Sequence, residues 1–318
     1  MRPVTLDDYI TSPEVKNIIS LSIKASKIKG KSFPHTIITG PPGTGKTTLA
    51  MIIAREMNNE SMLHELFAPS IKSMQMLINT FLKCKTGDVI FIDEIHSLDD
   101  KYEEVLYTII EDNKLVMSVM GKSIIYEIPD ITIIGATTDP SKVSTPLYDR
   151  FKQKIQLQKY TYQDMYNIIS SYISRLITHE QYNIMYTSDA IDQLVYVSRG
   201  TPRIALSYVD TSIDYALVNN ISIMDHNHII NTLHLLGIDK NGLNKVDRHI
   251  IMSIYDNGDA MSIDTLSSII GYSKQDIISM YEPYLIESGY IAISGKGRVL
   301  NQKGYDYISE YNKNGGDT

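Results

Sequence analysis

The sequence predicts an α/β domain, then a small all-helical domain, and then a C-terminal winged helix. Over residues 1–155, short apolar runs alternate with amphipathic stretches, as in a parallel sheet with crossover helices. Over residues 156–236, apolar residues recur at three- and four-residue spacing, which is typical of helices. Residues 237–318 start with a linker-like segment, continue with helical patterns and finish with a short hairpin pattern. These observations place domain boundaries near residues 155 and 236.

Three apolar runs are expected to form the central strands of the first domain. They are residues 36–39, 89–92 and 131–134, all short and rich in β-branched side chains. The all-helical domain is expected to contain four helices, listed here by residue number: 162–176, 188–197, 202–218 and 224–236.

The C-terminal pattern is typical of a DNA-binding winged helix. Residues 263–269 and 273–284 read as helices separated by a short turn, which is helix-turn-helix spacing. Residues 290–293 and 298–300 then flank the sequence SGKG. This arrangement predicts a two-stranded wing with Lys296 at a basic tip.

Composition limits the protein classes that remain. The chain of 318 residues is 43% hydrophobic and 21% charged, which is ordinary for a globular protein of two or three domains. No apolar run approaches the roughly 20 residues of a membrane span, and the N-terminus lacks the apolar core of a signal peptide. Cys84 is the single cysteine, so an internal disulfide is excluded, and we interpret it as an apolar filler. These features predict a cytoplasmic protein.

The net charge of −7 argues against attraction of nucleic acid to the whole surface. A nucleic-acid site must therefore lie on a local basic patch.

Residues 40–47 read GPPGTGKT and fit the phosphate-binding pattern G-x-x-x-x-G-K-[ST]. An apolar strand precedes this loop and a helical pattern follows it, so backbone N–H groups can turn toward an anion. Lys46 would reach the β- and γ-phosphates, and the Thr47 hydroxyl would bind Mg²⁺. The sequence therefore predicts ATP and Mg²⁺ as cofactors; the alternative is a chance Gly/Pro turn.

Two acids follow the second apolar run. Burying adjacent carboxylates is unfavourable unless they have a cation or a proton to handle. At the carboxyl edge of a parallel sheet, Asp93 would hold Mg²⁺ directly or through water, and Glu94 would polarise the water that attacks the γ-phosphate. The alternative is a helix cap after a strand.

Three further residues complete the predicted catalytic set. Thr138 follows the third apolar run and is a candidate sensor of the γ-phosphate. Arg150 ends the first domain and would complete a neighbouring subunit's site as an arginine finger, unless it forms only a surface salt bridge. Arg203 follows Pro202 at a helix start and would turn back toward the γ-phosphate.

Together these motifs resemble the AAA+ ATPases, and more narrowly the RuvB family of Holliday-junction branch-migration motors. The resemblance covers nearly the whole chain and all the predicted domains in order. It is carried by these stretches: 2–3 with 6–10, 91–96, 103–107, 134–138, 199–205, and 281–286 with Gly289.

The resemblance assigns roles to matching positions. It implies that Arg2, Tyr9, Ile10 and Tyr160 line the base and ribose pocket, and that Thr138 and Arg203 are the two sensor residues. It implies DNA contacts for Lys274 and Arg298; for Lys274 and Lys296 the alternative is an ordinary solvated lysine. The nucleotide-binding set is completed by Gly43, Thr44, Gly45, Lys46, Thr47, Thr48 and Pro202.

Some positions depart from the family pattern. Tyr148 replaces the first Arg of the usual Arg-Asp-Arg-Phe, and Asn113 stands where a Tyr is usual. Thr11 and Ser12 replace a usual Gly-Gln. Residues 115–128 match the hairpin that docks on the partner RuvA in the family, but its middle is reduced to MGKS. The need for a RuvA-like partner is therefore left open, and such divergence would suit a phage or mobile element.

The resulting hypothesis is a hexameric, ATP-hydrolysing ring motor that translocates double-stranded DNA and drives branch migration of four-way junctions. An AAA+ clamp loader or replication initiator is the first alternative, because it joins the same core to a winged helix. A nucleotide-binding scaffold without turnover is the second.

Overall fold

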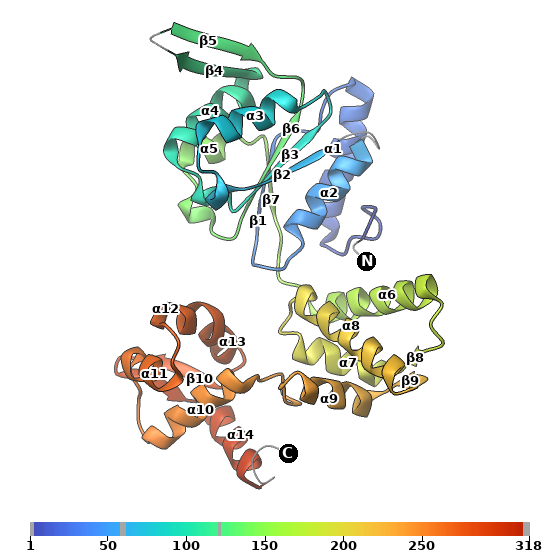
Figure 1. The fold of residues 1–318 in the computed structure, drawn as a ribbon, viewed down its shortest axis with the longest axis vertical. Helices are drawn as coiled ribbons and strands as arrows, with labels where there is room; N and C mark the ends of the chain where they lie inside the picture. The colour runs from blue at the N-terminus through green and yellow to red at the C-terminus, as the bar shows by residue number, and fades with distance from the viewer. Residues whose placement is uncertain (1–2, 58–61, 120–121, 314–318) are drawn as a thin grey trace. The chain divides into compact units, whose positions relative to one another are not determined.

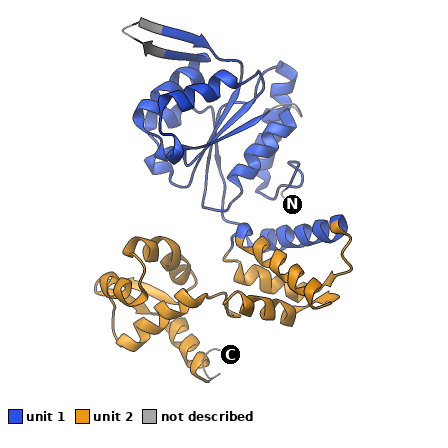
Figure 2. Ribbon diagram, viewed as in Figure 1, with its two compact units in different colours: residues 1–179, 200–203 blue, residues 180–199, 204–318 orange. Residues whose placement is uncertain are grey.

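A computed structural model describes residues 3–57, 62–119 and 122–313. The chain forms two compact units (Figure 2): residues 1–179 with 200–203, and residues 180–199 with 204–318. Both the predicted α/β class and the C-terminal winged helix are confirmed, while the boundaries at 155 and 236 remain predictions. None of the helices in the described ranges is long and apolar enough to cross a membrane.

The first unit is built on a five-stranded parallel sheet. The predicted strand 36–39 is confirmed, the second extends to Asp93, and the third shifts to residues 132–137. In spatial order the strands are β2 (Leu63–Phe67), β3 (Val89–Asp93), β6 (Thr132–Thr137), β1 (Thr36–Thr39) and β7 (Gln153–Gln156).

Helices cover both faces of this sheet (Figure 1). Successive strand residues point to opposite faces, so Ile37 joins one apolar core and Ile38 the other. The Ile38 core holds α1 (Pro13–Lys29) and α2 (Lys46–Met57). The Ile37 core holds α3 (Met74–Lys83) and α4 (Asp100–Asp112). Burial on both faces explains why the inner strands β3, β6 and β1 are mostly apolar, whereas the edge strands β2 and β7 carry exposed charged side chains.

A hairpin and two more helices complete the first unit. The hairpin pairs β4 (Lys114–Val119) with β5 (Lys122–Glu127) in antiparallel register, and its predicted reduced middle includes residues 120–121, which lie outside the described residues. α5 (Thr145–Arg150) precedes β7, and most of α6 (Tyr162–Glu180) belongs to this unit.

The second unit contains α7 (Ser188–Val197) and all but the first two residues of α8 (Pro202–Val218), and both helices have the predicted bounds. The next helix, α9 (His226–Leu235), starts two residues later than predicted. The reason is that β9 (Ile223–Met224) pairs with β8 (Met185–Tyr186), and the Asp225 side chain caps the helix by accepting from the His228 N–H.

The winged helix has its own apolar core. The predicted helix 273–284 is divided, because Pro283 has no N–H to continue the α-helical hydrogen bonds and a π-helical turn accommodates the break. Its elements are α10 (Lys245–Asn257), α11 (Ile263–Ile270), α12 (Lys274–Asp276), a π turn (Ile277–Tyr281), α13 (Glu282–Glu287), β10 (Ile291–Ser294), β11 (Gly297–Leu300) and α14 (Gln302–Lys313).

Candidate nucleotide and DNA sites

The loop between β1 and α2 is tightly enclosed. Gly43 has φ 79° and Gly45 has φ 87°, a region that favours glycine. A Cβ at Gly43 would lie 2.8 Å from Thr201 Cγ2, and one at Gly45 would lie 2.9 Å from Tyr9 Oη. Both the backbone conformation and the lack of space therefore require glycine here.

Lys46 is buried at the start of α2, with 7% of its surface exposed. Its ammonium donates to the Gly40 carbonyl at 2.8 Å and the Pro41 carbonyl at 3.1 Å. One of its three N–H donors therefore remains for a phosphate oxygen. Burial lowers the pKa of Lys46, while Glu94 and then Asp93 oppose that shift. The acids after β3 and the loop lysine thus share one electrostatic environment.

Two tyrosines fix the loop from its other side. The hydroxyls of Tyr9 and Tyr160 both donate to the Thr44 carbonyl, at 3.1 and 2.9 Å. Burial raises the pKa of both tyrosines, so both remain neutral hydrogen-bond donors. A cavity of about 320 Å³ lies beside them, lined by Thr11, Ser12, Pro13, Thr44, Gln156, Leu157, Gln158, Lys159, Tyr160, Thr161 and Asp164.

This cavity suits a nucleoside next to a phosphate loop. Half-buried Ile10 directly precedes Thr11, the first residue that lines the cavity. Arg2 lies outside the described residues. Thr47 and Thr48 are half-buried in the first turn of α2. Hydroxyl and carboxylate oxygens are the ligands that Mg²⁺ prefers, so Thr47 with Asp93 fits the predicted ion chemically.

The two acids at the end of β3, Asp93 and Glu94, are held by short contacts. Asp93 Oδ1 accepts the Glu94 N–H at 3.0 Å. Burial raises the pKa of Asp93, and the hydrogen bond from the Glu94 N–H opposes that rise. The charge of Glu94 adds to the rise, and the charges of Lys46 and Arg203 oppose it. Glu94 has φ 50°, an unusual conformation for a non-glycine residue that is often associated with functional sites.

Thr138, the candidate sensor of the γ-phosphate, lies against Glu94. Glu94 Oε2 accepts from the Thr138 N–H at 3.3 Å and from the Thr138 hydroxyl at 3.1 Å. His96 Nδ1 also lies 3.2 Å from Glu94 Oε2, a contact that was not predicted from the sequence. The available signal was its place three residues after Asp93, in the turn that follows the strand.

Arg203 lies with residues 200–203 in the first unit, where Thr201 approaches Gly43 of the loop. It is exposed in the first turn of α8, after half-buried Pro202, and its charge influences the pKa of both Lys46 and Asp93. The structure therefore brings together the predicted residues Lys46, Asp93, Glu94, Thr138 and Arg203.

Arg150 lies among a different set of residues. Its Nε is 2.9 Å from Glu111 Oε1 without hydrogen-bond alignment, and its Nη1 donates to the Pro146 carbonyl at 2.8 Å. Its guanidinium also lies 4.2 Å from the centre of the Tyr107 ring. These partners lie on α4 and α5, so within one chain Arg150 is held by α4, just before Asn113, and by its own helix.

The predicted DNA contacts differ in exposure. Lys274 is exposed and pairs with Asp264 on the preceding helix, and Lys296 is exposed at the wing tip. Arg298, in contrast, forms a two-pronged ion pair with Glu282, at 2.6 and 3.1 Å. The side chain of Arg298 is 12% exposed and that of Glu282 is 3% exposed. Arg298 therefore has a structural partner inside the winged helix.

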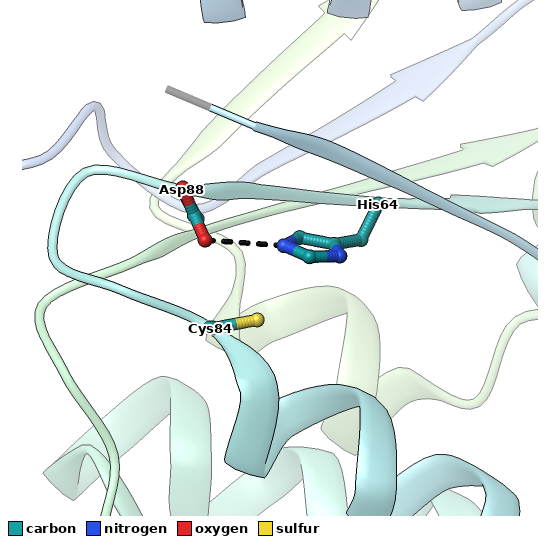
Figure 3. Close-up of side chains that lie close together, drawn as sticks. All are labelled: His64, Cys84 and Asp88. Atoms are coloured by element: carbon teal, nitrogen blue, oxygen red, sulfur yellow. Dashed lines mark hydrogen bonds and ion pairs between the residues drawn. The ribbon is translucent and has the colours of Figure 1, made fainter. Parts of the chain in front are cut away.

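One group of metal-ligating side chains lies together elsewhere in the described residues: His64, Cys84 and Asp88 (Figure 3). The Asp88 carboxylate already accepts from the Met62 and Lys85 N–H groups and lies 3.1 Å from His64 Nε2. Burial raises the pKa of Cys84 to about 12, so its sulfur remains a thiol. The hydrogen bonds account for this group as a tie between β2 and β3 without a metal.

Fold and site define a class: a P-loop NTPase with a helical segment and a winged helix. Residues 1–157 match the family model described as the Holliday junction DNA helicase RuvB P-loop domain, and residues 240–309 match the RuvB C-terminal winged helix domain.

Individual relatives agree over nearly the whole chain. A Holliday junction branch migration complex subunit RuvB from Fervidobacterium nodosum is 33% identical, over 97% of this chain and 88% of the relative. The protein of the same name from Fusobacterium nucleatum is 34% identical, over 98% and 93%. A solved structure of the Thermotoga maritima RuvB Holliday junction branch migration motor is 32% identical with a TM-score of 0.79, over 97% and 98%. The chain therefore belongs to the RuvB family.

Proposed function

We propose that this chain is an ATP-hydrolysing motor that translocates double-stranded DNA and drives branch migration of four-way junctions. The observation that carries the proposal is the convergence of Lys46, Asp93 and Glu94 in a chain that also has a winged helix. The names of its relatives support the junction as substrate.

Each part of the site has a role in this proposal. The loop N–H groups and Lys46 bind the phosphates, while the cavity next to Tyr160 holds the base and ribose. Mg²⁺ bound by Thr47 and Asp93 would neutralise phosphate charge. Glu94 accepts a proton from the attacking water, and Arg203 stabilises charge that develops on the γ-phosphate.

A neighbouring subunit would complete the site in a hexameric ring. Arg150 supports this proposal because its partners among the described residues lie on α4 and α5 and not in the phosphate-binding loop at residues 40–47. The ion pair with Glu111 would orient the guanidinium toward the neighbour. An Arg150→Ala variant that assembles and hydrolyses ATP normally would contradict this role.

The winged helix would contact the DNA backbone through exposed Lys274 and Lys296, while Arg298 supports the wing from inside. The exposed apolar residues of the hairpin, Val116, Ile125 and Tyr126, favour a protein partner that docks there. A RuvA protein is the candidate for that partner, so the assay below is run with and without it.

The test is ATP-dependent branch migration of a synthetic four-way junction in Mg²⁺, with Glu94→Gln as the control that retains nucleotide binding. We expect product from the wild type and none from Glu94→Gln. ATP-dependent loading of the DNA without strand movement would instead support a clamp loader or initiator. No turnover at high protein and DNA concentration would support a nucleotide-binding scaffold.

A further inference from the structure

His96 makes two contacts at the edge of the nucleotide site. Its Nδ1 forms a hydrogen bond with Thr137 Oγ1 at 2.9 Å and lies 3.2 Å from Glu94 Oε2. The His96 side chain is 15% exposed and that of Glu94 is 28% exposed, so both contacts are largely shielded from water.

These contacts determine which ring nitrogen carries a hydrogen. A bare lone pair on Nδ1 would repel the Glu94 carboxylate at this distance, whereas an N–H is attracted to it. Thr137 Oγ1 already accepts the Asp139 N–H at 3.0 Å and has a second lone pair for His96. The Nδ1–H group therefore bridges a buried hydroxyl and the carboxylate.

The two oxygens of Glu94 consequently differ. Oε2 receives the Thr138 N–H, the Thr138 hydroxyl and the nearby His96 Nδ1–H. Among the described residues, Oε1 has one long contact, 3.4 Å from the Thr138 hydroxyl. Restraint of one oxygen leaves the other available to accept a proton in a fixed direction.

We propose that His96 is a positioning residue for Glu94: anchored on Thr137, it holds Oε2 so that Oε1 can act as the base. This inference rests on the proposed ATP hydrolysis and adds a residue to it. The buried anchor matters, because Thr137 has no exposed surface and lies on the central strand β6. Because the His96 ring is hydrogen-bonded to β6, it cannot move together with the turn that carries it.

The test compares three substitutions of His96 in the full-length protein, assayed for DNA-stimulated ATP hydrolysis. The amide nitrogen of Asn is as many bonds from Cα as Nδ1, whereas that of Gln corresponds to Nε2. We expect His96→Ala and His96→Gln to lower kcat by roughly 10- to 100-fold, the range expected for a displaced base. His96→Asn should stay within about threefold of the wild type, and KM for ATP should not change in any variant.

A double-mutant cycle separates positioning from general structural support. In a Glu94→Gln background there is no base to position, so adding His96→Ala should lower the residual rate no further. A loss of the usual size in that background would overturn the proposal, as would a wild-type rate for His96→Ala or equal rates for Asn and Gln. A wild type that does not hydrolyse ATP would instead refute the proposed function.

Discussion

The Arg298→Ala substitution is expected to lower the stability of the winged helix without removing a DNA contact. The guanidinium makes both bonds to Glu282, whose side chain is 3% exposed. Removing one member of a buried ion pair leaves the other charge uncompensated, which destabilises a protein by about 3–5 kcal/mol. A loss of 3 kcal/mol lowers Tm by roughly 12–24 °C in a domain of 60–100 residues.

Lys296→Ala is the matched control, two positions away at the exposed wing tip. It should leave Tm unchanged and reduce the slope of log affinity against log salt by about 0.9, the value of one lost phosphate contact on duplex DNA. Arg298→Ala should leave that slope unchanged at a temperature where the domain remains folded. Calorimetry gives Tm, hydrogen exchange locates the destabilised segment, and DNA titrations at several salt concentrations give the slope.

A second variant guards against a trivial loss of folding. Replacing the pair together, with Glu282→Leu and Arg298→Met, removes both charges and should recover most of the lost stability. The reasoning is refuted if Arg298→Ala melts like the wild type and lowers the salt slope. In that case the guanidinium would contact phosphate, and its pairing with Glu282 would contribute little.

Three further predictions concern the first unit. Gly45→Ala should abolish nucleotide binding, measured by titration with a fluorescent ATP analogue, because its Cβ would lie 2.9 Å from Tyr9 Oη at φ 87°. Burial lowers the pKa of His35 to about 4 in the folded protein, where its Nδ1 accepts the Ile133 N–H. As the pH falls, the unfolded chain therefore takes up a proton on His35 before the folded protein does. Stability should fall by up to about 3 kcal/mol as pH drops from 6.5 to 4, and His35→Asn, which keeps an acceptor, should remove this dependence in urea titrations. Asp88→Asn should cost about 1–3 kcal/mol in the same assay, because an amide cannot accept every hydrogen bond that the carboxylate accepts, while Zn²⁺ or EDTA should leave wild-type unfolding unchanged.

The elements that follow a local rule were predictable from the sequence. Buried parallel strands appear as short β-branched runs, so residues 36–39 were placed without error and the strand before Asp93 within one residue. The π turn was not predicted, because the helical periodicity of residues 273–284 continues through Pro283. Periodicity reports which face is buried and is insensitive to one missing backbone donor.

The site divides in the same way. Lys46 and Glu94 were found because their roles depend on neighbours in the sequence, a loop and a strand end. The contact of His96 with Thr137 joins residues 41 positions apart, and its presence depends on the register of β3 against β6. Arg298 illustrates the opposite case: its position suggested DNA, but only the fold reveals the buried partner Glu282.

The segment from Arg199 to Arg203 contains residues of both compact units. Arg203 influences the charge balance of Lys46 in the first unit. Arg199, four residues earlier, forms an ion pair with fully buried Asp247 in α10, donates to the Gly242 carbonyl at 2.7 Å, and lies 3.9 Å from the centre of the Tyr284 ring. Arg199 thereby ties the end of α7 to the winged helix through a buried, directional contact.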